Sequence, residues 1–215
     1  MGRVSQAQAR ENRQRVVETA SRLFREQGVH VSVADLMKAA GLTHGGFYKQ
    51  FASKETLVDE ATAHAFEELA RTYAPAAGRE AGTGEAGARE AGAGEAGAGS
   101  GGSAGRPARS RDAAAQRELI DAYLSVRHRD NPADGCPVAG LATDMARTDD
   151  SRAAHRVYAD GVRGFADALA TEGEDDGLVR VCTMVGALVL ARATSDDPLS
   201  EDLLTAARTA LTHGG

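Results

Sequence analysis

The chain has no tryptophan, and aromatic residues make up only 4% of its 215 residues. Its core must therefore be built from alanine, leucine and valine, and the scarcity of alternating β-branched runs favours helices over strands. The two cysteines, Cys136 and Cys182, are too few for a disulfide framework or a cysteine-rich zinc site. The sequence predicts an all-α protein of about nine helices.

Several functional classes have no signal in this sequence. No secretory leader opens the chain, and the longest apolar run, Val181–Ala191, is too short to span a bilayer of about 30 Å as a helix. No nucleophile elbow, His-Glu-x-x-His motif or phosphate-binding loop is present, and the six histidines are scattered. We therefore expect a cytoplasmic protein that is not an enzyme and has no cofactor and no bound metal.

Positive charge is concentrated at the N-terminal end. Residues 1–54 hold nine Lys/Arg and four Asp/Glu, which gives +5 and leaves −11 for the rest of a chain of net charge −6. A basic end on an acidic chain is typical of a protein that binds DNA at that end. A solvated helix face would also explain the pattern.

The basic end contains a pair of short helical patterns between Ser32 and Leu57. Ser32 and Thr43 are positioned to cap the two helices, and Gly41 lies between them where a sharp turn requires a positive φ. Two helices of this length joined by a glycine-containing turn predict a helix-turn-helix, whose second helix enters the DNA major groove.

The exposed positions around this motif supply groups suited to DNA. Hydroxyl and ammonium donors can bind phosphates without reading the sequence, whereas a histidine or lysine on the second helix can reach base edges. The predicted phosphate contacts are Ser32, Thr43, Tyr48 and Lys54, the predicted base readers are His44 and Lys49, and Gly45 allows close approach of the backbone. Tyr48 has an alternative interpretation, as an aromatic side chain packed inside the head.

The segment AAGLTHGGFYKQFASKETLV resembles the helix-turn-helix signature of TetR-family transcriptional regulators. The matching residues are Gly41, Tyr48, Phe51, Ser53, Lys54, Glu55 and Leu57. Gly46 departs from the family pattern, in which a small hydroxylated residue is usual at this position. The resemblance covers roughly residues 10–70 and implies a three-helix head, a connecting helix, and a helical body that binds an effector and dimerises.

The sequence divides into three parts. Residues 1–54 form the predicted head, in which a helix over Arg10–Gln27 precedes the helix-turn-helix, and a connecting helix runs over residues 54–73. Residues 75–111 contain the repeat REAGTGEAGA–REAGAGEAGA, which predicts a disordered, low-complexity insertion because frequent glycine cancels the helix preference of alanine and glutamate. The Gly-x-Gly-x-x-Gly pattern inside the repeat follows no strand, so no nucleotide site is expected.

Residues 112–215 return to helical periodicity and form the predicted body. We expect helices from Asp112 to near Asp130, from Pro137 to Ala146, from Ser151 to Ala170, and over the last two stretches. The resemblance implies an effector pocket among these helices. The larger inward-facing side chains are its candidates, or else ordinary core residues: Tyr123, Met145, Tyr158, Phe165 and Met184.

Cys136 precedes Pro137 at a predicted helix N-terminus. Backbone dipoles at that position stabilise a thiolate, which would lower the pKa of the thiol and make it a sensor of electrophiles or oxidants. The alternative is a small residue tolerated before proline.

The last two helices, over residues 178–193 and 198–212, carry small and apolar residues on several faces. A helix without a polar face must be covered on both sides, either in the interior of a monomer or by a second copy. We predict a two-fold homodimer through these helices, because a two-fold dimer needs such a self-complementary patch. Together these features predict a repressor that binds a palindromic operator in double-stranded DNA and is released by an unknown small molecule or electrophile. The competing hypothesis is an all-helical dimeric protein-interaction module without DNA binding.

Overall fold

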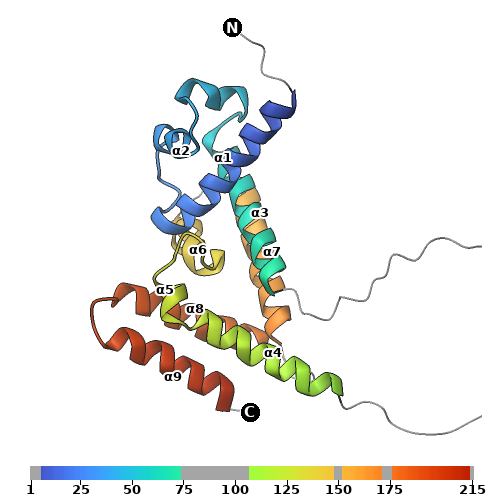
Figure 1. The fold of residues 1–215 in the computed structure, drawn as a ribbon, viewed down its shortest axis with the longest axis vertical. Coiled ribbons are helices and arrows are strands. Elements are labelled where there is room, and N and C mark those ends of the chain that lie inside the picture. The colour runs from blue at the N-terminus through green and yellow to red at the C-terminus, as the bar shows by residue number, and fades with distance from the viewer. Residues whose placement is uncertain (1–5, 74–106, 148–151, 171–175, 214–215) are drawn as a thin grey trace, which may run out of the picture.

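The computed structural model describes residues 6–73, 107–147, 152–170 and 176–213 (Figure 1). Within these residues the chain forms nine α-helices and one 3-10 helix, and no strand. The prediction of an all-α fold is therefore confirmed. None of the described helices is both long enough and apolar enough to cross a membrane.

Three elements form the head at one end of the molecule (Figure 1). Helix α1 packs against α2, and α2 packs against the 3-10 helix η1. The bounds are α1 Gln6–Gln27, α2 Val33–Ala39 and η1 His44–Lys49. The connecting helix α3, Lys54–Tyr73, begins at a serine cap, where the Ser53 hydroxyl accepts a hydrogen bond from the Thr56 N–H at 3.3 Å. The three-helix head that the resemblance implies and the connecting helix predicted over residues 54–73 are both present.

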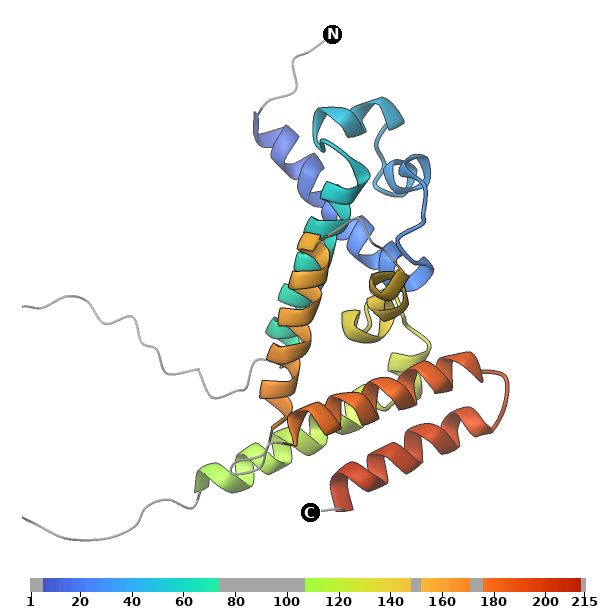
Figure 2. The same cartoon turned by 180° about the vertical axis from the view of Figure 1, so that it is seen from behind.

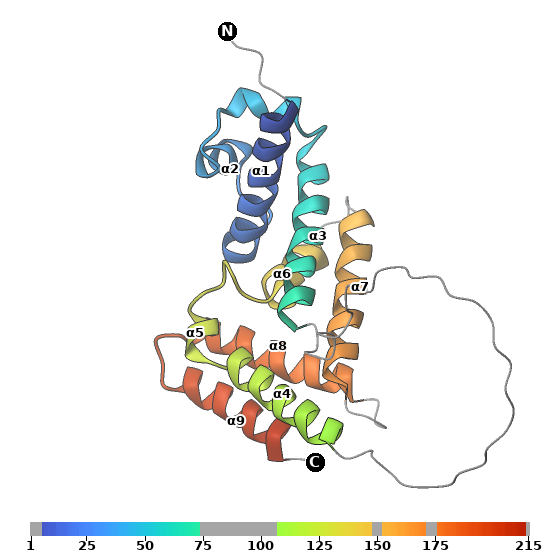
Figure 3. The same ribbon diagram turned by 45° about the vertical axis from the view of Figure 1, so that its right-hand side comes forward.

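The body is arranged around the lower half of α3. Helix α7, Arg152–Leu169, runs beside α3 in all three views (Figures 1 to 3). Gly161 lies at this contact, where a Cβ atom would come within 2.1 Å of the Phe66 ring. Helices α8 and α9 form an antiparallel pair at the far end, with α4 beside them (Figure 3), and their bounds are α8 Gly177–Ala193, α9 Leu199–His213 and α4 Pro107–Tyr123.

Two helix boundaries differ from the predicted ones. Helix α4 begins at Pro107, within the segment predicted to be a disordered insertion, whose residues 75–106 lie outside the described part of the chain. The helix predicted to continue to near Asp130 ends at Tyr123, and a separate short helix α5, Val126–Arg129, follows. The break occurs because the Ser125 hydroxyl caps α5 by accepting from the His128 N–H at 3.2 Å.

The buried apolar residues form two clusters. One fills the body between α3, α4, α7, α8 and α9. The other fills the head, but its walls include Leu141 and Met145 of α6, Pro137–Arg147, and Ala154 of α7. The core of the head therefore continues past residue 54 and is completed by two helices of the body.

Candidate functional site

The turn between α2 and η1 has a fixed geometry. The Gly41 N–H donates to the Lys38 carbonyl at 3.0 Å, and the Leu42 N–H donates to the Met37 carbonyl at 2.8 Å. This is a Schellman motif, which ends a helix with a residue in the left-handed region, and Gly41 has φ of +70°. The predicted role of Gly41 is confirmed, and the turn fixes the direction of η1 relative to α2.

The inner side of η1 anchors it to the head. Phe47 is fully buried and stacks on Phe51, with 5.4 Å between the ring centroids. The opposite side is open to solvent, because His44, Gly45 and Lys49 are exposed and Tyr48 keeps 68% of its surface exposed. The alternative that Tyr48 packs inside the head is therefore wrong, and the four predicted positions on η1 share one exposed surface.

The remaining predicted phosphate contacts, Ser32, Thr43 and Lys54, each lie at the start of a helix. The Ser32 hydroxyl accepts from the Asp35 N–H at 3.1 Å, as predicted for a cap, and also donates to the Asp35 carboxylate at 2.6 Å. Thr43 is exposed but makes no capping hydrogen bond, so its predicted capping role is wrong. The first turn of η1 is closed by a backbone hydrogen bond, in which the Gly46 N–H donates to the Thr43 carbonyl at 2.9 Å.

Lys54 is half-buried at the first residue of α3. Burial lowers the pKa of its ammonium group, and the neighbouring Glu55 opposes that shift. The side chain is partly desolvated beside the first turn of a helix, where backbone N–H groups also attract anions.

Arg13 fixes the end of η1. Its guanidinium donates to the Glu60 carboxylate at 2.6 Å, lies 4.7 Å above the centre of the Phe51 ring, and reaches the Gln50 carbonyl at 3.4 Å. These contacts join α1, α3 and the residues that follow η1. The Arg13 guanidinium is thus occupied by contacts within the protein.

The five side chains predicted for an effector pocket lie in two places. Tyr123, Phe165 and Met184 are packed in the body core with at most 3% of their surface exposed. The Tyr158 hydroxyl donates to the Val138 carbonyl at 2.7 Å, and burial raises the pKa of Tyr158 to about 12. Met145 requires a correction, because it packs into the head core and not into the body.

A cavity of about 400 Å³ lies at the junction of head and body. It is bounded by the end of α1, the last turns of α3 and the loop before α6, and none of the five predicted effector residues lines it. The residues that line it include Arg25 of α1, His128 of α5 and Cys136 of the loop, together with Glu68, Arg71 and Thr72 of α3.

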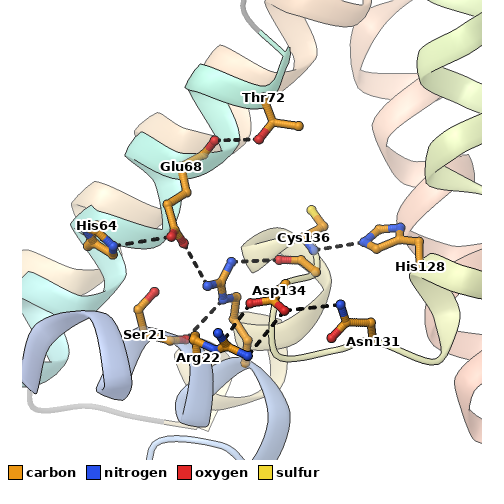
Figure 4. Close-up of polar contacts among 11 residues, drawn as sticks. Ser21, Arg22, His64, Glu68, Thr72, His128, Asn131, Asp134 and Cys136 are labelled. Atoms are coloured by element: carbon orange, nitrogen blue, oxygen red, sulfur yellow. Dashed lines mark hydrogen bonds and ion pairs between the residues drawn. The ribbon is translucent and has the colours of Figure 1, made fainter. Parts of the chain in front are cut away.

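Arg25 is the most enclosed charged group at this junction, with 4% of its side chain exposed. Its guanidinium donates to the Glu68 carboxylate at 2.8 Å, to the Ser21 carbonyl at 3.1 Å and to the Gly135 carbonyl at 3.0 Å (Figure 4). Sequence analysis did not single out this group. Its partners lie 43 and 110 residues away in the chain, so no local pattern connects them.

Cys136 does not have the environment expected of a reactive thiol. It keeps 2% of its surface exposed, and burial raises the pKa of the thiol above its ordinary value, although hydrogen bonds from Tyr123 and the backbone oppose the shift. The predicted lowering of its pKa by the helix N-terminus is therefore wrong, because desolvation of the thiolate outweighs the backbone dipoles. Cys182 is exposed. Within the described ranges, no group of three or more histidine, cysteine or acidic side chains is arranged to hold a metal ion.

The fold and the exposed turn-and-helix surface define the chain as an all-helical helix-turn-helix protein. Residues 16–61 match the family profile described as bacterial regulatory proteins, tetR family. A segment of 61 residues is 41% identical to the HTH-type transcriptional regulator AcrR of Shigella flexneri, and this segment spans 28% of the chain and 28% of that relative.

The similarity in fold extends over nearly the whole chain. A TetR transcriptional regulator from Chloroflexus aurantiacus is 22% identical with a TM-score of 0.65, covering 96% of this chain and 95% of that one. The reduced form of Escherichia coli NemR is 16% identical with a TM-score of 0.64, covering 94% and 96%. The chain thus resembles the tetR family of bacterial regulatory proteins in sequence over residues 16–61 and in fold over most of its length.

Proposed function

We propose that this chain is a sequence-specific DNA-binding transcriptional regulator, a repressor in its ground state. The observation that carries the proposal is the exposed surface of η1, on which His44, Gly45, Tyr48 and Lys49 all face solvent at the end of the molecule opposite the α8–α9 pair (Figure 1). In this arrangement η1 enters the major groove, His44 and Lys49 contact base edges, and Thr43, Tyr48 and Lys54 contact phosphates. Ser32 joins them when its hydroxyl leaves Asp35.

Footprinting on the DNA that flanks the gene for this chain tests the proposal. A regulator of this kind protects a palindromic site, and its affinity falls about 10³-fold or more between 50 and 200 mM salt if it contacts six or more phosphates. The competing protein-interaction module predicts no protected site and an association with little salt dependence. Absence of protection at 50 mM salt on every flanking fragment would contradict the proposal.

A homodimer is part of the proposed function, because a palindrome is read by two heads. Helix α8 carries an exposed apolar stripe at helical spacing, which consists of Val179, Cys182, Val189, Leu190 and Ala193. Leu178 and Leu199 extend the apolar surface, with 56% and 49% of their surface exposed. Large exposed apolar surfaces mark interaction sites, and pairing of α8 and α9 with a second copy would cover this one. The two heads would then bind half-sites about 34 Å apart, one turn of DNA.

We place the effector in the junction cavity of about 400 Å³ and not among the packed residues of the body core. Its volume is in the range of small-molecule sites. Because its walls come from α1, from α3 and from the loop before α6, a ligand there would contact both the head and the body. Release of the operator then follows as a shift toward a conformation in which the two heads no longer match successive grooves.

A further inference from the structure

One peptide group at the junction is bound from both sides. The Gly135 carbonyl accepts a hydrogen bond from the Arg25 guanidinium at 3.0 Å, and the Cys136 N–H donates to His128 Nε2 at 3.1 Å (Figure 4). These two backbone groups belong to the same planar peptide unit, which moves as a rigid body. Arg25 of the head and His128 of the body therefore contact each other through a single rigid group, named the junction peptide below.

The junction peptide fixes the protonation state of His128. A backbone N–H can only donate, so Nε2 must present a lone pair to Cys136. The proton of the neutral ring is then on Nδ1, which donates to the Tyr123 carbonyl at 2.7 Å. An added proton on Nε2 would point at the Cys136 N–H, so the hydrogen bond between His128 and the junction peptide would be lost.

The groups that face His128 come from several elements. From α8, Arg192 donates to the His128 carbonyl at 3.1 Å, and from α4 the Tyr123 ring lies at 4.6 Å between centroids. The charged and titratable groups that share the cavity with His128 are Arg25 of α1, Glu68 and Arg71 of α3, and Asp134 and Cys136 of the loop.

The nearby carboxylates have other partners. Glu68 pairs with Arg25 at 2.8 Å and Asp134 pairs with Arg22 at 3.3 Å. In the part of the chain that the structure describes, no carboxylate lies within ion-pair distance of His128. Burial lowers the pKa of His128 below its ordinary value, the hydrogen bond to the Tyr123 carbonyl opposes this shift, and Arg192 adds a smaller lowering.

On the head side of the contact, the Arg25 side chain has little freedom to move. The Arg25 guanidinium is also bound to the Ser21 carbonyl and to Glu68, so it is fixed relative to α1 and α3. Helix α6 lies directly on the same turn of α1, where a Cβ atom on Gly140 would come within 3.1 Å of the Arg25 backbone. On the body side, a Cβ atom on Gly135 would come within 2.8 Å of Arg192 and 3.2 Å of His128 Nε2. A displaced junction peptide must therefore pull on Arg25 or break from it.

We propose that His128 is a proton-sensitive coupling residue, whose protonation releases the junction peptide and thereby loosens the attachment of the head to the body. At neutral pH the peptide joins Arg25 to His128 and the head keeps its orientation. In acid the Cys136 hydrogen bond is lost and the Gly135 carbonyl shifts relative to Arg25. The consequence for operator binding rests on the proposed function, whereas the coupling itself does not.

The coupling can be tested on the full chain without DNA. In ¹⁵N-labelled protein titrated from pH 7.5 to 5.0, we expect the Cys136 amide and the Arg25 Nε–H signals to shift together with the ring nitrogens of His128. His128→Gln retains one donor and one acceptor but does not titrate, so both signals should become independent of pH. His64→Gln is the matched control, since His64 approaches Glu68 at 3.4 Å from the opposite side, and it should leave the response intact.

Two results would overturn the proposal. One is a Cys136 amide signal that stays constant while the His128 ring titrates. The other is an Arg25 response that survives in His128→Gln or disappears in His64→Gln. If the Cys136 amide signal of His128→Gln differs from that of the wild type at pH 7.5, the glutamine does not reproduce the contact. The titrations of the wild type and of His64→Gln then decide whether the proposal stands.

Thermal denaturation gives a second readout. Because the native state favours neutral His128, the unfolded chain binds more protons below the ordinary histidine pKa of about 6.5. The contribution of His128 to stability is thus complete above about pH 6.5 and is lost as the pH falls toward the lowered native pKa. We expect the Tm of the wild type to fall further than that of His128→Gln between pH 7 and 5, and equal falls would contradict the proposal.

The coupling and the proposed function can fail separately. If these tests support the coupling but footprinting shows no protected DNA, the coupling stands and the proposed function is wrong.

Discussion

At the scale of single residues, Gly46 is a position in η1 where the fold would accept a side chain. A Cβ atom there would approach Met37 at 3.6 Å and Thr43 at 3.8 Å, which is ordinary contact. We expect Gly46→Ala to raise the free energy of unfolding by about 0.5–1 kcal/mol, chiefly because alanine reduces the freedom of the unfolded chain. Urea denaturation measures the change.

Gly41 provides the matched control for that substitution. Its φ of +70° is unfavourable for residues with a Cβ atom, although nothing lies within 4 Å of the added carbon. Gly41→Ala should therefore lower the free energy of unfolding by about 1–2 kcal/mol. If both alanine variants changed stability in the same direction, backbone conformation would not be what distinguishes the two glycines.

Cys136 is expected to react slowly despite its position before a helix. In a Cys182→Ser variant it is the only thiol, and burial keeps its pKa above the ordinary value. Since the thiolate is the reactive species, its reaction with a disulfide reagent at pH 7.5 should be much slower than that of free cysteine. The rate should rise to the free value in denaturant. A native rate equal to that of free cysteine would restore the hypothesis of an electrophile sensor.

At the scale of elements, the contact between α3 and α7 depends on Gly161. A Cβ atom at this position would lie 2.1 Å from the buried Phe66 ring, so Gly161→Ala must displace the ring or separate the helices. We expect a loss of about 1–3 kcal/mol in the free energy of unfolding. Gly164, on the same helix, has nothing within 4 Å, and Gly164→Ala should instead stabilise by about 1 kcal/mol. Calorimetry measures the change in the free energy of unfolding for both variants, which packing determines at Gly161 and helix propensity determines at Gly164.

The predicted phosphate contacts make a prediction about salt dependence. If Lys54 contacts a phosphate, Lys54→Ala should reduce the slope of log K against log salt by about 1. Arg22→Ala is a control of equal charge change, because Arg22 pairs with Asp134 at the junction, at 3.3 Å, and not at η1. Fluorescence anisotropy at several salt concentrations measures both slopes. A larger effect at Arg22 would place the DNA on another surface.

The elements differ in how far the sequence could predict them. The turn at Gly41 and the connecting helix over residues 54–73 follow from local patterns, and both were predicted correctly. The break before α5 was missed, because Ser125 can act as a cap or as an ordinary helix residue and only the surrounding fold decides between them.

The candidate site was predictable to the same limited extent. The exposed positions on η1 follow from the spacing of the apolar residues in the motif. The junction around Arg25 and Glu68 does not, because contacts across 43 and 110 residues leave no periodic signal. The environment of Cys136 could not be predicted either. Its position before Pro137 is visible in the sequence, whereas its burial depends on how α3 and α4 pack around it.

At the scale of the whole molecule, the apolar stripe on α8 predicts the oligomeric state. Leu190 is 53% exposed within one copy of the chain. Leu190→Glu places a charge in the proposed interface. If the proposed dimer forms there, sedimentation should show a dimer for the wild type and a monomer for the variant. The secondary structure should be unchanged, because an exposed side chain in one copy has no intramolecular role to lose. A variant that remains dimeric would exclude this surface of α8.

The core of the head has a consequence for how this protein can be recombined. Leu141, Met145 and Ala154 complete that core, although they lie far along the chain from the turn that they support. Cutting after Tyr73 would leave an apolar opening where these three side chains belong. A chimera that gives this protein's operator preference to another ligand-binding scaffold therefore needs α6 and the start of α7 transferred with residues 1–73, or complementary side chains designed in the recipient.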